Sequence, residues 1–238
     1  MSTPNAWQVS AAPSTTAYFD ESLRQHMLRV YNYMGGGLVL TGIVALFVAS
    51  TPAIYQPIFG TPLKWVVIFA PLAFIFFLSF RIQTISAATA QTLFWVFCAL
   101  MGLSFAAVFL VFTGTSIART FFITAAMFGA TSLYGYTTRR DLSKFGSFLF
   151  MGLIGVVIAS LVNLFIGSSA LQFLVSVVGV LVFTGLTAYD TQNIKEQFAE
   201  DFGSETNSKL AVWGALSLYL NFINIFQLLL NLTGDREA

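Results

Sequence analysis

The chain has 238 residues, of which 57% are hydrophobic and 9% are charged, and its mean hydropathy is +0.80. A soluble globular domain carries about 25% charged residues, so this composition predicts an integral membrane protein. The formal net charge of +1 gives no reason to expect a nucleic acid as a partner. One cysteine, Cys98, and one histidine, His26, provide neither an intrachain disulfide nor a transition-metal cluster.

The N-terminal part is polar and has no Lys or Arg before an apolar core, unlike a secretory signal peptide. We therefore expect a flexible polar tail over residues 1–22 and a seven-span membrane domain over residues 23–238. Asp20 is the expected N-cap of a short interfacial helix that leads into the membrane. His26, within that helix, is expected to be a solvated or interfacial side chain.

Uncharged runs separated by charged residues and turn signals predict seven membrane spans. A helix needs about 20 residues to cross a bilayer, and Pro52, Pro57 and Pro62 mark a loop after the first span. We find no internal repeat and no second domain. The predicted spans are 30–50, 63–80, 90–112, 120–138, 145–166, 170–190 and 210–232.

The distribution of Lys and Arg predicts the orientation. One side of the membrane would hold eight of the eleven basic residues, and this side is expected to be cytoplasmic, together with the N-terminus. Seven full crossings place the C-terminus outside, whereas a re-entrant last span would return it to the cytoplasm. The eight residues are Arg24, Arg29, Arg81, Arg139, Arg140, Lys144, Lys195 and Lys209.

The end of the chain holds the candidate site. Asp190 follows a long uncharged run, and a carboxylate at the margin of hydrocarbon is costly enough to be a candidate functional residue. In the last span, Asn224, Gln227 and Asn231 recur at helical spacing, and such amides need protein or water opposite them. The last helix should therefore lie inside the bundle and face Asp190. Arg81 ends the second span at a similar depth, so it can pair with Asp190 if the two helices are neighbours.

Two sequence stretches near the C-terminus form a recognisable signature. They read G-L-T-A-Y-D-T-Q-N-I-K (185–195) and L-S-L-Y-L-N-F-I-N-I-F (216–226). Further matches are L-R-V-Y-N-Y-M (28–34), F-F-L-S-F-R (76–81) and R-D-L-S-K-F-G-S-F-L-F-M-G-L-I-G (140–155). Together they resemble the bacterial branch of the transmembrane Bax inhibitor motif family, also called the Bax inhibitor-1 family.

The resemblance implies an all-α membrane fold in which the last helix is central and six helices surround it. It also implies a pH-modulated calcium leak channel of the bacterial inner membrane. In that family an aspartate pair on helices 6 and 7 binds a proton or cation, and an arginine on helix 2 acts as a latch. By motif these positions are Asp190, Asn221 and Arg81, so an asparagine replaces the second aspartate.

This replacement changes the expected chemistry. Two close carboxylates cannot both ionise cheaply, and such a pair makes a proton switch. With Asn221 the switch should be blunted, and calcium binding at Asp190 should be weak because calcium prefers about 6–8 oxygen ligands. No other cofactor is expected. Asn224 and Gln227 could line a pore, or they could serve only as hydrogen-bonding groups between helices.

Other readings stay open at this point. Asp190 could be only the structural partner of Arg81. The resemblance also implies a stress-response protein that binds and modulates a membrane-anchored ATP-dependent protease, and deletion of residues 1–17 would separate that role from a leak. An intramembrane aspartyl protease needs two carboxylates that share a proton, and no second one lies within a predicted span. We therefore expect no enzyme, and we expect the lipid bilayer and calcium or other cations as partners.

Overall fold

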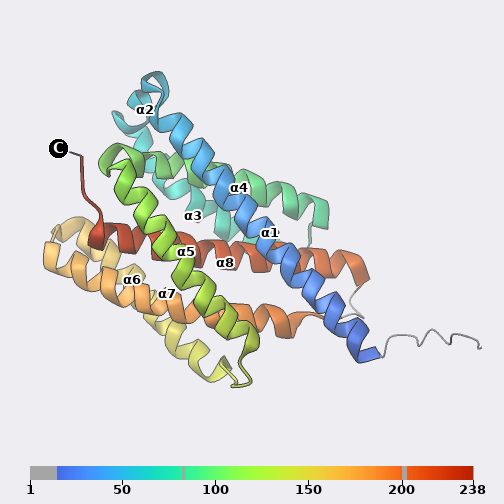
Figure 1. Ribbon diagram of the computed structural model, residues 1–238. Helices are drawn as coiled ribbons and strands as arrows, with labels where there is room; N and C mark the ends of the chain where they lie inside the picture. The colour runs from blue at the N-terminus through green and yellow to red at the C-terminus, as the bar shows by residue number, and fades with distance from the viewer. Residues whose placement is uncertain (1–14, 82–83, 200–202, 238) are drawn as a thin grey trace, which may run out of the picture.

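The computed structural model describes residues 15–81, 84–199 and 203–237, which are coloured in Figure 1. These ranges hold eight α-helices and, apart from one isolated bridge between Phe112 and Arg236, no β-structure. In chain order the helices are α1 (Thr15–Ala49), α2 (Pro52–Phe59), α3 (Leu63–Arg81), α4 (Ala87–Val111), α5 (Gly114–Thr137), α6 (Ser143–Ile166), α7 (Ser169–Gln197) and α8 (Gly203–Thr233).

All of these helices except α2 are long and apolar enough to cross a membrane, which confirms the seven predicted spans. The last two are longer than predicted, because α7 continues seven residues past Asp190 and α8 begins at Gly203. Large apolar side chains cover the outer face of the bundle, and Phe80 and Phe165 are 82% and 88% exposed. Such a surface is suited to lipid, and the chain is a multi-pass membrane protein.

The first helix differs from the prediction. α1 runs without a break from Thr15 to Ala49, so Asp20 lies inside the helix, and its assignment as an N-cap is wrong. The same helix includes residues 15–22 of the predicted tail, whereas residues 1–14 lie outside the described ranges. The glycines of α1 allow close packing on α4, since a Cβ on Gly36 would lie 2.9 Å from the Trp95 ring.

The proline-rich segment predicted as a loop contains a short helix, α2. Pro52 occupies its first turn, where the missing N–H of proline would have no partner in any case, and Thr51 precedes it in an extended conformation. Gly60 ends the helix, and its N–H donates to the Gln56 carbonyl at 2.8 Å. Proline therefore starts this helix rather than preventing it.

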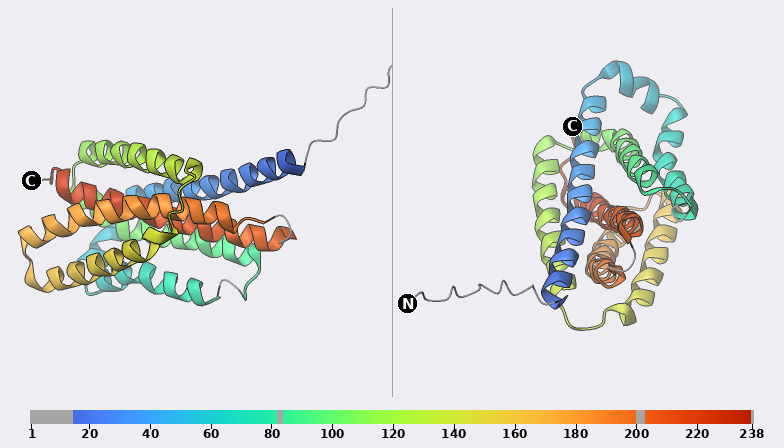
Figure 2. Two further views of the ribbon diagram at one scale, coloured as in Figure 1. Left: turned by 90° about the horizontal axis from the view of Figure 1, so that it is seen from below. Right: turned by 90° about the vertical axis from the view of Figure 1, so that its right-hand side faces the viewer.

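α8 lies in the middle of the bundle, as the end-on view in Figure 2 shows. It packs against α7, α1, α5 and α4, and a larger part of it is buried than of any other described span. α3 and α6 lie further out, since α3 packs mainly against α4 and α6 packs against α7. This arrangement buries Asn221 and half-buries Asn224, whereas Gln227 and Asn231, nearer the C-terminal end of α8, are exposed.

Hydrogen bonds between side chains join the helices at depth. The hydroxyl of Thr41 donates to the Cys98 carbonyl at 2.9 Å, and it lies 2.7 Å from the hydroxyl of Tyr219. These contacts link α1, α4 and α8. Tyr31 on α1 likewise bonds Ser132 on α5 at 2.7 Å. Each such bond satisfies polar groups that lipid could not satisfy.

The segment after α8 is bound to the corner between α4 and α5. The Thr113 N–H donates to the Asp235 carbonyl at 3.0 Å, and the Glu237 N–H donates to the Val111 carbonyl at 3.0 Å. The Asp235 carboxylate also lies 3.6 Å from the Arg119 guanidinium. The far end of α8 is therefore fixed to two other helices.

Candidate functional site

The candidate site centres on Asp190, a residue of α7 whose side chain contacts α8. Its Oδ2 accepts a hydrogen bond from Asn221 Nδ2 at 2.7 Å and another from Ser217 Oγ at 2.9 Å. α7 ends at Gln197, so at about 1.5 Å per residue the carboxylate lies roughly 10 Å from that helix end. The structure thus brings together Asp190 and Asn221, two of the residues singled out in the sequence.

The helical repeat of α8 explains how two of its side chains reach one carboxylate oxygen. Ser217 and Asn221 are four residues apart, and residues at this spacing lie on one face of a helix. Asn221 is 4% exposed, so its amide is held inside the bundle. The sequence argument missed Ser217, although its spacing from Asn221 could have identified it.

Asn221 is level with Asp190 because both helices extend beyond the predicted spans. If the last helix began at Leu210, Asn221 would lie deep in the membrane, whereas Asp190 would lie at the end of the preceding helix. The two side chains would then be at different depths. In the structure α8 begins at Gly203 and α7 ends at Gln197, so both residues lie well inside their helices. The connector between the two helices is correspondingly short.

Arg81 lies elsewhere. It is the last residue of α3 and is exposed, and α3 packs mainly against α4. Across the described ranges, no ion pair or hydrogen bond joins its guanidinium to Asp190. The condition for pairing, that α3 and α7 are close neighbours, is not met in this structure. The latch role of Arg81 stays a prediction.

The residues around Asp190 do not form a ligand set for a resident metal ion. One carboxylate, one hydroxyl and one carboxamide fall short of the roughly 6–8 oxygens that calcium prefers. In the described part of the chain, no group of three His, Cys, Asp or Glu side chains could hold a metal ion. The arrangement is suited to a proton or to brief contact with a passing cation.

A groove with a mainly apolar wall lies further along α8, toward its C-terminal end. It has a volume of about 710 Å³, and its walls come from α3, α6, α7 and α8. Apolar side chains such as Trp65 and Phe69 form part of its wall, and none of its described lining residues is charged. Five carboxamides line this amide groove: Asn163, Gln172, Asn224, Gln227 and Asn231.

The other side of Asp190 contains a small internal cavity of about 30 Å³, which we call the inner cavity. Asp190, Ser217, Trp213 and His26 are among its lining residues. The expectation that His26 is a solvated or interfacial side chain is wrong, because His26 is 5% exposed and its ring lies 4.9 Å from that of Phe198. It is buried because α1 packs across the beginning of α8 at this point.

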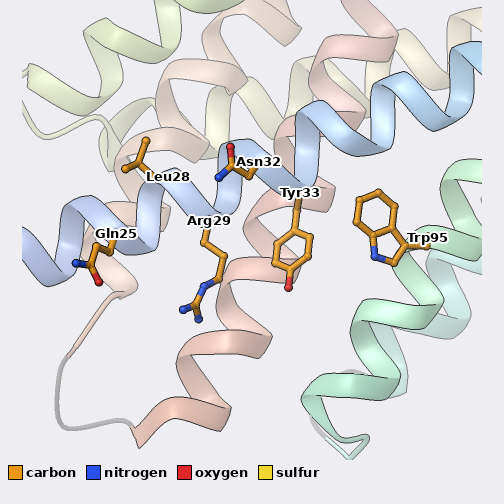
Figure 3. A pocket seen from close by; sticks show the side chains of 6 residues that line it. All are labelled: Gln25, Leu28, Arg29, Asn32, Tyr33 and Trp95. Carbon is orange, nitrogen blue, oxygen red and sulfur yellow. The ribbon is translucent and has the colours of Figure 1, made fainter.

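A larger recess lies between α1 and α4 at the same end of the bundle (Figure 3), and its volume is about 430 Å³. Gln25, Arg29, Tyr33 and Trp95 are among the residues that line it. Figure 3 shows Arg29 extending from α1 toward α8, where its Nη1 donates to Ser208 Oγ at 3.4 Å. This end of the bundle is therefore polar and accessible from outside.

Comparison with known proteins identifies the family. The family described as Inhibitor of apoptosis-promoting Bax1 matches residues 23–238. An uncharacterized protein of Rickettsia prowazekii is 49% identical over 219 residues, which cover 92% of this chain and 93% of the relative. The inner membrane protein YbhL of Escherichia coli K12 is 47% identical over 218 residues, which cover 90% of this chain and 93% of the relative. The chain, with its seven apolar helices and a matched region that extends from α1 to the C-terminus, belongs to the Bax inhibitor-1 family.

Proposed function

We infer that this protein is a cation leak pathway of a bacterial inner membrane, through which calcium passes under the control of proton binding at Asp190. One observation carries the proposal: a polar stripe on the central helix joins a carboxylate to the amide groove. The stripe consists of Ser217, Asn221, Asn224, Gln227 and Asn231.

The length of the stripe supports a pathway. Residues 217 to 231 extend over roughly 21 Å at about 1.5 Å per residue, which is a large part of a hydrocarbon core of about 30 Å. Carboxamide oxygens are suitable ligands for calcium. Because they are uncharged, they bind a passing ion weakly enough to release it, as conduction requires.

The position of Asp190 supports control by protons. When ionised, the carboxylate offers a passing cation a negative charge inside the bundle, and a bound proton removes that charge. The hydrogen bonds from Ser217 and Asn221 hold the carboxylate toward α8. With an amide at position 221 in place of a second carboxylate, we expect a shallow dependence of flux on pH.

Arg81 enters the proposal as a latch that acts when α3 moves. α3 has few partners besides α4, so it can shift at a lower cost than the central helices. We expect Arg81→Gln to raise the flux if the guanidinium blocks the pathway in a closed state. Equal flux in this variant and in wild type would remove the latch from the proposal.

The location and orientation are also part of the proposal. YbhL of Escherichia coli is described as an inner membrane protein, and eight of the eleven Lys and Arg residues lie at the end of the bundle where α1 begins. By the positive-inside rule this end is cytoplasmic. Labelling of Glu21→Cys and of Glu237→Cys, each in a Cys98→Ser background and from either side of the membrane, tests the assignment.

The test is calcium flux into liposomes that contain the purified protein, measured on either side of neutral pH. Wild type should conduct, and Asp190→Asn should change the flux and remove its pH dependence. Asp141→Asn is the matched control, because Asp141 is an exposed carboxylate in the connector between α5 and α6. A silent wild-type protein, or an Asp190→Asn variant that behaves like wild type, would contradict the leak function.

A further inference from the structure

His26 is a buried titratable group that the proposed leak does not use. It lies on α1 and is 5% exposed, and its Nε2 has no hydrogen-bond partner among the residues that the structure describes. A buried polar atom without a hydrogen-bond partner destabilises the folded protein. Such an atom in a native structure is commonly explained by a bound water molecule or by a functional role. Its neighbourhood indicates such a purpose.

Two cavities meet at His26. The inner cavity also contains Asp190, Asn193 and Ser217 in its wall. An outer cavity of about 380 Å³ has Gln25 and Arg29 in its wall. Of the described lining residues, His26 alone belongs to both. The imidazole thus separates the polar end of the bundle from the space beside the carboxylate.

The inner cavity is large enough for water. A cavity needs about 10–15 Å³ to hold one water molecule, together with two to four polar partners. The inner cavity has about 30 Å³, and its wall contains a carboxylate, a hydroxyl and carboxamides. One or two water molecules would therefore fit between the imidazole and Asp190.

We propose that His26 is a proton-transfer residue that carries protons between the outer cavity and Asp190. In the forward direction the imidazolium releases a proton from one ring nitrogen to water in the inner cavity, and that water gives a proton to the carboxylate of Asp190. The ring then turns so that its free nitrogen faces the outer cavity, where it accepts a proton from a hydronium ion and becomes an imidazolium again. Histidine is suited to this step because its two ring nitrogens can serve the two sides and because it titrates near neutral pH.

Among the described lining residues of the two cavities, two besides His26 carry a charge or can do so. Asp190 faces it from α7 across the inner cavity, and Arg29 lies one turn along α1 in the wall of the outer cavity. The residues that α8 contributes to the two cavities are all uncharged. The imidazole therefore lies between a described negative charge on the side of the inner cavity and a described positive charge on the side of the outer cavity.

The proposal goes beyond the leak function and can be tested without any cation gradient. After a rapid drop in pH, stopped-flow infrared spectroscopy follows the carbonyl band of protonated Asp190, with Asp190→Asn to assign the band. We expect His26→Ala to slow the appearance of this band by about 100-fold, a typical contribution of a positioned acid–base group. Free imidazole added to His26→Ala should restore the rate, and Asn32→Ala, on α1 but outside the described walls of both cavities, should leave the rate unchanged.

An unchanged rate in His26→Ala, or a slow rate that imidazole does not restore, would overturn the proposal. A second measurement needs no change at His26. Trp213 lines the inner cavity, and Trp7→Phe, Trp65→Phe and Trp95→Phe leave it as the single tryptophan. Its fluorescence should fall when a neighbouring imidazolium forms. Fluorescence that does not change around neutral pH would also overturn the proposal. A protein that fails to conduct calcium would still give both signals, so this proposal and the leak function fail separately.

Discussion

The substitution Asn221→Asp restores the carboxylate pair that this chain lacks. The Asn221 amide nitrogen lies 2.7 Å from Asp190 Oδ2, and an aspartate side chain has nearly the same shape, so two carboxylates would occupy adjacent positions. The hydrogen bond that Asn221 donates would be lost at the same time. Two ionised groups in this geometry repel each other, and the pair should keep one proton.

The repulsion can be estimated from the geometry. Two unit charges about 4 Å apart interact by about 4 kcal/mol at an effective dielectric constant of 20. At about 1.4 kcal/mol for each factor of ten, this energy disfavours the doubly ionised pair by nearly 1,000-fold. The shared proton should therefore persist over a pH range in which wild type has none at this site.

Equilibrium infrared spectroscopy of the variant in lipid provides the assay. We expect a protonated carboxyl band at neutral pH that is absent from wild type, and a steeper pH dependence of calcium flux. Asn224→Asp is the matched control, because Asn224 lies on the same helix but its amide donates to the Leu220 carbonyl rather than to Asp190. A spectrum of Asn221→Asp that matches wild type, or an equal effect of Asn224→Asp, would refute the reasoning.

Further predictions concern packing and pH. A Cβ at Gly135 would collide with the Ala188 carbonyl oxygen of α7, so Gly135→Ala should lower the thermal unfolding midpoint in detergent through overpacking of about 1–3 kcal/mol. Gly35→Ala, with nothing within 4 Å of the added Cβ, should leave the midpoint unchanged. Equal midpoints for the two variants would contradict this packing. Thr41→Val removes the bond to Tyr219 and should cost about 1 kcal/mol, measured as reduced stability against denaturation; an unchanged value would show that the bond contributes nothing. Hydrogen bonds from Ser143 lower the pKa of Asp141 in the folded protein. The ionised carboxylate therefore stabilises the fold fully at pH values above the ordinary carboxyl pKa of about 3.9. This stabilisation is lost only as the pH falls through the lowered pKa of the folded state. Asp141→Asn should accordingly leave any pH response near neutrality unchanged, and a shifted flux profile would contradict this assignment.

The membrane fold could be predicted because its signals are local. Long uncharged runs set the spans, and the amide stripe predicted that the last helix lies inside the bundle. The ends of the helices were less accessible to prediction. Polar residues such as those on both sides of the α7–α8 connector can continue a helix beyond the membrane, and hydropathy does not report this continuation.

The site could be predicted only in part, because it depends on which helices touch. The motifs pointed to Asp190 and Asn221, and the structure joins them by a hydrogen bond. The sequence does not show that α3 packs mainly against α4, so the position of Arg81 relative to Asp190 could not be deduced. His26 was misjudged for the same reason, since its burial arises from Phe198 and the beginning of α8, far away in the sequence.

The attachment of the C-terminal segment limits how this bundle can change shape. The bonds from Asp235 and Glu237 to the α4–α5 corner hold one end of α8. Sliding or rotation of α8 would break these bonds, whereas displacement of a peripheral helix would leave them intact. α8 therefore acts as a fixed axis, and the helices free to move past it are α3 and α6. Any opening of the bundle should begin at the amide groove, because both of these helices form part of its wall beside α8.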